Sequence, residues 1–249
     1  MEKEGKRCLR RVVLVPAPFQ GHINPMLQLG SILHSNGFSI TVVHAQYNSP
    51  DPSTHPDFSF IPLPDSSTDQ TIIGGQSLDF VLELNAKCKA RFPECLAQVM
   101  TQLGSDDRIA CIIHDDFMFF SQETAKDLKI PSIVLRTTSA SNFFARDALF
   151  QLKAEGHLPF PENRLQDPVP ELYPLRYKDL PLPPLGIVEK VMQLLSKASN
   201  FETSSAIINN TIDCLENSSL EECAAEAVEK EVPTKWVPMG FTGMGLHRN

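Results

Sequence analysis

A histidine and a pair of aspartates each follow a short apolar run that has the character of a buried strand. His22 follows the run 12–15, and Asp115 and Asp116 follow the run 109–113. The carboxyl ends of parallel strands meet at one edge of a sheet, where open α/β folds bind ligands, so we expect these side chains to lie close together. A carboxylate that accepts from one imidazole nitrogen leaves the other nitrogen to take a proton from a hydroxyl. The pattern predicts a dyad that activates an alcohol or a phenol.

Each of these side chains also has a purely structural interpretation. A single histidine in a turn is often simply hydrogen-bonded there, and an aspartate after a strand is often the N-cap of the next helix. Since Asp115 and Asp116 are adjacent, one of them can cap the following helix while the other faces the ligand.

Aromatic side chains follow the same predicted strand ends. They are Phe19, Phe117, Phe119, Phe120, Phe143 and Phe144. Aromatic stripes usually pack in a core, but here three successive turns at one sheet edge each carry phenylalanine. An apolar pocket with few polar groups is how flat hydrophobic small molecules are bound, so the alternative is a ligand pocket beside His22.

Short apolar runs alternate with helical patterns along most of the chain. The expected strands are 12–15, 38–44, 58–63, 109–113, 132–135 and 205–209. The expected helices are 24–35, 77–103, 117–128, 139–153, 187–199 and 214–230. This alternation predicts an α/β fold, a Rossmann-like parallel sheet with helices on both faces.

Several residues predict where these elements start, stop or bend. Asn24 and Pro25 suit the N-cap and first position of the first helix, which places His22 on the preceding turn, and Gly37 suits its carboxyl end. Pro93 is expected to kink or divide the helix 77–103. The proline-rich stretch 156–186 is expected to be a long ordered loop.

Composition narrows the function classes. The chain has 249 residues, 42% hydrophobic and 21% charged, with a net charge of −8. Its acidic balance argues against nucleic-acid binding, which needs a basic surface. No apolar run reaches the ~18 residues of a membrane span, and the sequence opens on a basic cluster rather than a signal peptide, so a cytoplasmic protein is expected. The six cysteines have no metal-site spacing and are expected to be free thiols, most of them buried.

The sequence lacks the common nucleotide-binding and hydrolase motifs. It contains no GxGxxG after the first strand, no GxxxxGK[ST] and no GxSxG. A nicotinamide-binding site, a P-loop and a serine-hydrolase elbow are therefore not indicated.

Several separate stretches resemble plant UDP-dependent glycosyltransferases. They are PAPFQGHINPMLQL, QYNSPDPSTHPDFSF, HDDFMFFSQETAKDLKIPSIVLRTTSA, PELYPLRYKDLP and SSAIINNTIDCLE, and the similarity covers about residues 11 to 238. Members of that family have a two-domain GT-B fold. Its amino-terminal half mostly binds the acceptor, and its carboxy-terminal half mostly binds the nucleotide sugar.

The resemblance implies a role for individual residues. His22 matches the catalytic base, and Asp115 matches the acid that orients it. The acceptor pocket would be bordered by Phe19, Gln20, Phe117, Phe119 and Phe143, and the donor side by Gly21 and Thr137. The implied reaction is inverting transfer of a sugar, glucose above all, from a UDP-sugar co-substrate to a hydroxyl of a small hydrophobic acceptor such as a flavonoid or phenol, with no metal and no other cofactor.

The carboxyl end departs from the family pattern. The family's HCGWNS-like donor box is absent, the single tryptophan is Trp236, and GFTGMGLHRN replaces the expected linker. We therefore expect a truncated member: a flexible tail at 1–10, an acceptor-binding domain at 11–231 and the start of an interdomain linker at 232–249. Such a chain should not glycosylate alone, and an apolar face left exposed should favour self-association. The alternative is a non-catalytic remnant that binds a hydrophobic small molecule or a full-length relative.

Overall fold

The chain divides into two compact units. The computed structural model describes residues 10–64, 78–102, 107–169, 172–180, 188–201, 203–211, 215–217, 219, 221 and 237–238. Unit 1 comprises Met1–Thr137 with Glu202–Ile207, and unit 2 comprises Thr138–Phe201 with Ile208–Asn249. The expected tail 1–10 lies outside the described residues except for its last position, where the first strand begins.

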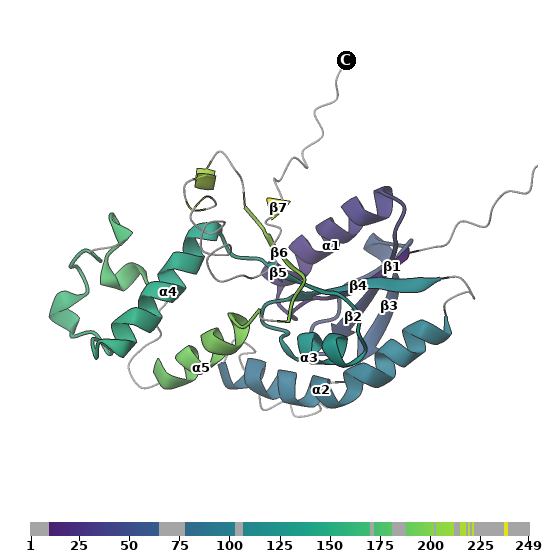
Figure 1. Ribbon diagram of the computed structural model, residues 1–249, viewed down its shortest axis with the longest axis horizontal. Coiled ribbons are helices and arrows are strands. Elements are labelled where there is room, and N and C mark those ends of the chain that lie inside the picture. The colour runs from purple at the N-terminus through teal and green to yellow at the C-terminus, as the bar shows by residue number, and fades with distance from the viewer. Residues whose placement is uncertain are drawn as a thin grey trace, which may run out of the picture. The chain divides into compact units, whose positions relative to one another are not determined.

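A parallel sheet organises the fold (Figure 1). Its strands are β1 (Arg10–Val15), β2 (Ser39–Ala45), β3 (Ser59–Leu63), β4 (Arg108–Asp115), β5 (Ser132–Arg136), β6 (Ala206–Asn209) and β7 (Val237–Pro238). They follow the order β3-β2-β1-β4-β5-β6-β7. The β1–β2, β1–β4, β2–β3 and β4–β5 pairs are all parallel, as the strand–helix alternation predicts.

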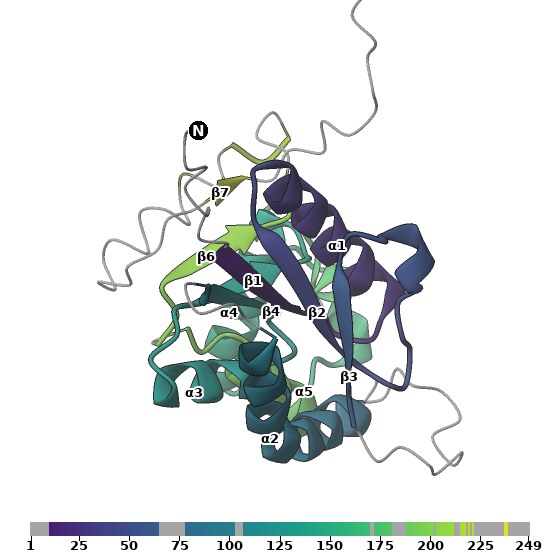
Figure 2. The same ribbon diagram turned by 90° about the vertical axis from the view of Figure 1, so that its right-hand side faces the viewer.

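Helices cover both faces of the sheet in unit 1. Helix α1 (Gln20–Ser35) lies on one face, and α2 (Leu78–Thr101) and α3 (Phe120–Asp127) lie on the other (Figure 2). The central strands are apolar and buried over most of their length because both faces are covered; Val13, Leu14 and Val42 are fully buried. The predicted fold class is confirmed.

Helix α1 starts four residues earlier than predicted. Its N-cap is Phe19, whose carbonyl accepts from the backbone N–H groups of His22 and Ile23 at 2.8 and 2.9 Å. Asn24 is therefore not the N-cap, and Pro25 lies inside the helix. A proline this close to the amino end removes only the bond to the Gly21 carbonyl, which the helix tolerates. His22 consequently belongs to the first turn of α1 and not to the loop before it.

The other end of α1 behaves as predicted. Asn36 is the C-cap and Gly37 has a φ of 88°, a left-handed conformation that glycine adopts without strain. Farther back, Gly30 packs directly on the sheet, because a Cβ there would lie 2.8 Å from Leu14 Cδ1 and 3.0 Å from Phe58 Cε2. This glycine lets α1 approach β1 closely.

Strand β4 is longer than its apolar core. His114 and Asp115 are its last two residues, whereas the sequence placed them on the following turn. His114 pairs with Val15 of β1 and Val134 of β5, so ladder bonds on both sides extend the strand through polar residues. Neither aspartate caps α3, whose N-cap is Phe119 with no side-chain bond, so that expectation is wrong.

Helix α2 runs through its proline. Pro93 lies inside the continuous 24-residue helix Leu78–Thr101, so it does not divide it. Phe92 and Leu96 of this helix are fully buried, and this packing offsets the hydrogen bond lost at the proline. The thiols of Cys88, Cys95 and Cys111 are free, as predicted; the other three cysteines lie outside the described residues.

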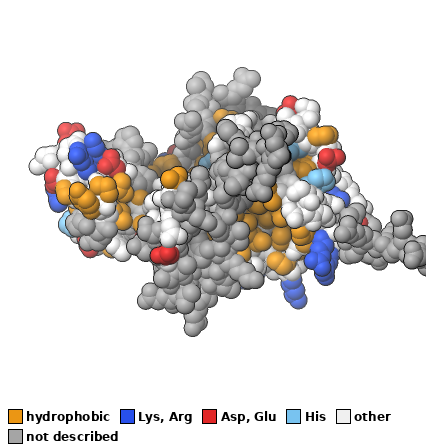
Figure 3. Space-filling view, turned by 90° about the horizontal axis from the view of Figure 1, so that it is seen from above, with side chains coloured by type: hydrophobic (Ala, Val, Ile, Leu, Met, Phe, Trp, Pro, Cys, Tyr) orange, Lys and Arg blue, Asp and Glu red, His pale blue; other side chains and the backbone are white. Residues whose placement is uncertain are grey.

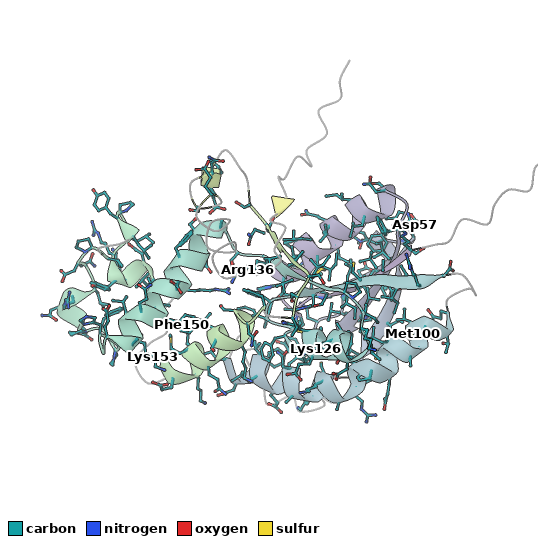
Figure 4. The ribbon with its side chains drawn as sticks, in the orientation of Figure 1. Asp57, Met100, Lys126, Arg136, Phe150 and Lys153 are labelled. Carbon is teal, nitrogen blue, oxygen red and sulfur yellow. The ribbon has the colours of Figure 1, made fainter. Side chains whose placement is uncertain are left out.

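Unit 2 contains the helices α4 (Ala140–Ala154) and α5 (Val188–Ala198), with short 3-10 turns η2 (Glu162–Arg164) and η4 (Tyr177–Asp179) between them. Lys153, labelled in Figure 4, pairs with Glu189 at 2.7 Å and links the two helices. The described part of 156–186 is an ordered loop, as predicted, in which the rings of Phe160 and Tyr177 lie 4.5 Å apart. Among the described residues of the chain, no helix is long and apolar enough to cross a membrane.

Candidate active site

The topology brings His22 and Asp115 to the same edge of the sheet. Asp115 ends β4, and His22 lies on the first turn of the helix that follows β1. Strands β1 and β4 are neighbours, with Val15 opposite His114, so the two side chains start from adjacent strand ends. Residues separated by 93 positions in the chain therefore come into contact.

A short hydrogen bond joins the pair. His22 Nδ1 lies 2.7 Å from Asp115 Oδ2, and the aspartate is fully buried. The other carboxylate oxygen, Oδ1, accepts the backbone N–H of Phe117 at 2.9 Å and so fixes the orientation of the carboxylate. An acceptor at Nδ1 assigns the proton to that nitrogen, and Nε2 is then the basic nitrogen of the ring.

Electrostatics favour a base at this position. Burial raises the pKa of the Asp115 carboxyl, and its hydrogen bond with His22 and the Phe117 N–H act in the opposite direction. A buried carboxylate beside an imidazole stabilises the imidazolium that forms when the ring takes up a proton. His22 itself stays partly exposed, with 17% of its side chain accessible, so a ligand can approach it.

The Thr137 hydroxyl also contacts His22 Nδ1, the nitrogen that is bonded to Asp115. It follows Arg136, the last residue of β5, labelled in Figure 4, and its Oγ1 is 3.0 Å from His22 Nδ1. Because the Nδ1 proton points at Asp115, the Thr137 hydroxyl acts as a second acceptor. A residue that the sequence placed on the donor side thus contacts the imidazole directly.

Aromatic rings surround the imidazole. Phe19 meets it edge-on at 5.7 Å between ring centroids, and Phe117 lies at 5.3 Å with a tilt of 32°. The structure adds two rings that the sequence analysis missed, Phe80 and Tyr47. The centroid of the Phe80 ring lies 6.2 Å from that of Phe19 and 4.7 Å from that of Tyr47. A continuous aromatic wall therefore runs from Tyr47 to Phe117.

Asn85 is a further residue that the sequence analysis missed. It is only 3% exposed, on the buried face of α2. Its Nδ2 donates to the carbonyls of Phe117 at 2.7 Å and Val81 at 2.8 Å, and its Oδ1 accepts from the Phe120 N–H at 3.2 Å. Asn85 and Asp115 together hold both backbone polar groups of Phe117. An amide within an otherwise apolar helical stripe was the available sequence signal.

The remaining candidate residues lie on α1, on α4 and at the start of α3. Gln20 lines a hollow beside α1, and Gly21 is exposed with open space where a Cβ would lie. Phe119 is the partly exposed N-cap of α3. Phe143 belongs to α4, but its side chain lies outside the described residues.

Within the described part of the chain, one group of side chains could hold a metal ion. His22, Asp115 and Asp116 each offer a ligand atom, and these atoms lie within 4.8 Å of one another. Asp116 is 2% exposed, and its charge adds to the upward shift of the Asp115 pKa. A metal bound to Nδ1 would have to replace the 2.7 Å hydrogen bond with Asp115. The pair as it stands is better suited to proton transfer than to metal binding.

The fold and the site define an α/β protein that carries a hydrogen-bonded histidine–aspartate pair at the carboxyl edge of a Rossmann-like sheet. No protein-family model matches the chain. In sequence it is 42% identical over 223 residues to UDP-glycosyltransferase 76E1 of Arabidopsis thaliana, and 44% identical over 211 residues to a protein of the same name in Solanum lycopersicum. These alignments cover 88% and 84% of this chain, but 48% and 44% of the relatives.

The chain belongs to the plant UDP-glycosyltransferase family, and it spans about half the length of the curated relatives it matches. Another relative, 41% identical over 87% of the chain, is the flavonol 3-O-glucosyltransferase UGT76E12 of Arabidopsis thaliana. The predicted resemblance is confirmed.

Solved structures give the same result for the fold. A UDP-glucosyltransferase from Polygonum tinctorium matches with a TM-score of 0.72 at 18% identity, covering 97% of this chain and 54% of that one. Phytolacca americana UGT2, solved with UDP-2-fluoroglucose and pterostilbene, matches with a TM-score of 0.68 at 19% identity. This alignment covers 95% of the present chain and 54% of the UGT2 chain.

Proposed function

We propose that this chain supplies the acceptor-binding side and the base of a UDP-glycosyltransferase. The reaction is inverting transfer of a sugar, glucose above all, from a UDP-sugar to a hydroxyl of a small hydrophobic acceptor such as a flavonoid or phenol. The observation that carries the proposal is the 2.7 Å contact between His22 Nδ1 and the buried Asp115 carboxylate, with the rings of Phe19 and Phe117 packed against the imidazole.

The proton moves through His22. Its Nε2 takes the proton of the acceptor hydroxyl as the oxygen attacks the anomeric carbon of the sugar. The new carbon–oxygen bond forms on the face opposite the departing UDP, so the bond to the diphosphate breaks with inversion. Asp115 stays ionised and stabilises the imidazolium until the proton leaves.

The other residues fit around this step. Phe19 and Phe117 border the acceptor pocket through their contacts with the imidazole, and Gln20, Phe119 and Phe143 are assigned to the same pocket by family resemblance. Thr137 and Gly21 are assigned to the donor side on the same ground, although Thr137 also contacts His22. Neither a metal nor another cofactor takes part in this proposal. A cytoplasmic location and self-association stay predictions from the sequence.

The test joins this chain to the donor half of a relative. The carboxy-terminal half of a 76E relative, fused after residue 238, should glucosylate a flavonol or a simple phenol in the presence of UDP-glucose. His22→Ala in the fusion should lower turnover by roughly 10²–10⁴-fold, because the base is lost. The matched control is Gln98→Leu, an exposed position on α2.

The result also separates the two hypotheses. A folded fusion that binds the phenol but forms no glucoside would favour the non-catalytic remnant. A His22→Ala fusion with normal turnover would show that the assigned base is wrong.

A further inference from the structure

A hollow of about 470 Å³ lies beside α1. It is formed by α1 and the segment 48–55 that follows β2, and neither His22 nor Asp115 is among its described lining residues. Its volume is within the range of small-molecule sites in proteins. In Figure 3, which looks onto the side of the sheet that α1 covers, the visible described surface mixes hydrophobic, acidic, basic, histidine and other polar side chains.

The hollow has an apolar floor and a polar rim. Ile23, Leu27 and Pro50 line it and are buried, whereas eight of its eleven lining residues are polar. On α1 the rim consists of Gln20, Asn24 and Gln28, all three exposed. Their four-residue spacing places the three amides along one face of the helix.

The amides suit hydroxyl groups. An amide presents a donor and an acceptor side by side, and a hydroxyl is likewise both. Gln20 Nε2 already donates to Asn24 Oδ1 at 2.7 Å, which orders the pair and leaves the remaining polar groups of both amides for a ligand. The apolar floor can carry the C–H face of a sugar ring.

The opposite wall is held in place by its own hydrogen bonds. Asn48 Nδ2 donates to the Pro18 carbonyl at 3.1 Å, and Asp51 Oδ1 accepts from Ser53 N–H at 2.9 Å. Thr54 Oγ1 donates to the Asp51 carbonyl at 2.8 Å. A wall ordered before the ligand arrives reduces the entropy cost of binding.

The few charged side chains that line the hollow argue against ionic ligands. The described lining residues include no lysine or arginine, and their only carboxylate is Asp51, so phosphates, nucleotides and carboxylates are disfavoured. One carboxylate, already accepting an N–H, is too little for a divalent cation. The polar majority of the lining does not suit a flat hydrocarbon. A neutral polyhydroxylated ligand remains.

We infer that this hollow is a binding site for a neutral sugar unit, either a free hexose or the sugar of a glycoside. Neither residue of the dyad is among the described lining residues, so the inference stands whether or not His22 transfers a sugar. Its chemistry lies in the Gln20, Asn24 and Gln28 amides above the Ile23–Leu27–Pro50 floor.

The side-chain amide signals of the ¹⁵N-labelled chain provide the test. Glucose, phenyl β-glucoside, phenol and uridine monophosphate are titrated separately to about 10 mM, a range that detects millimolar dissociation constants. We expect glucoside to shift the Asn24 and Gln28 signals, and phenol and uridine monophosphate to leave these two in place; Gln20, which is also assigned to the acceptor pocket, is not used as a readout. An equal shift by glucose indicates a site for free sugar, and a shift by glucoside alone indicates a site for a sugar already attached to an aglycone.

Variants complete the experiment. Asn24→Leu and Gln28→Leu should each weaken binding at least tenfold, and Gln98→Leu, an exposed amide on α2, should leave it unchanged. The inference is overturned if neither sugar shifts these amides, if phenol or uridine monophosphate shifts them as strongly, or if the two variants bind as well as the control.

Discussion

Asn85→Leu tests how the site is held together without relying on any enzyme assay. The change removes an amide that is 3% exposed and makes three hydrogen bonds. The Phe117 carbonyl and the Phe120 N–H each lose this partner, at about 1–3 kcal/mol per group. Together the two lost partners cost about 4 kcal/mol at the middle of that range, and burial of the leucine side chain recovers about 2 kcal/mol. The free energy of unfolding should therefore fall by about 2 kcal/mol.

Urea unfolding of the 249-residue chain measures this difference. Gln98→Leu makes a similar change on the exposed side of the same helix and should stay within about 0.5 kcal/mol of wild type. Hydrogen exchange adds a local measurement, since the Phe120 amide should exchange faster in Asn85→Leu than the other amides of α3. An Asn85→Leu variant as stable as the control, with the Phe120 amide still protected, would refute the reasoning.

Three further changes follow from the structure. Asp115→Asn should move the His22 proton from Nδ1 to Nε2, visible in ¹⁵N spectra of the imidazole, because the amide N–H replaces an acceptor; an unchanged tautomer would contradict the assignment. Burial lowers the pKa of His114 to about 4, so its contribution to the free energy of unfolding is present above pH 6.5 and is lost as the pH falls toward 4. His114→Phe should therefore lose less stability than wild type between pH 6.5 and 4.5 in urea titrations, and equal losses would argue against a buried neutral ring. Glu216 accepts from the Ala140 and Ser141 N–H groups at the start of α4, so Glu216→Gln should cost about 0.5–2 kcal/mol and speed exchange of those two amides. The same change at the C-cap of this helix, Glu155→Gln, should cause neither effect, because a carboxylate is not favoured at that end.

Much of the architecture could be read from local patterns. The apolar run 12–15, the glycine at position 37 and the alternation of strands and helices predict the start of the sheet, the end of α1 and the fold class. These features depend on neighbours in the chain, so their signals are local in the sequence. The same locality explains the errors, because ladder bonds from β1 and β5 extended β4 through His114 and Asp115.

In the candidate site, the sequence predicts one contact of His22 but not the residues that support it. Strand order alone predicts that His22 and Asp115 meet, since parallel strands end at one edge. The sequence could not reveal that Asn85, on a helix from a different part of the chain, fixes the Phe117 backbone beside the imidazole. Nor could it reveal that Thr137 reaches the same nitrogen as Asp115.

The sequence by itself determined the elements, the family and the two residues of the dyad. The tertiary structure decided which side chains surround that dyad, that Phe80 and Tyr47 extend its aromatic wall, and that Gln20 lines a hollow beside α1. The physical reason is distance along the chain. Periodicity and capping act over a few residues, whereas these contacts join segments that only the packing of helices on the sheet brings together.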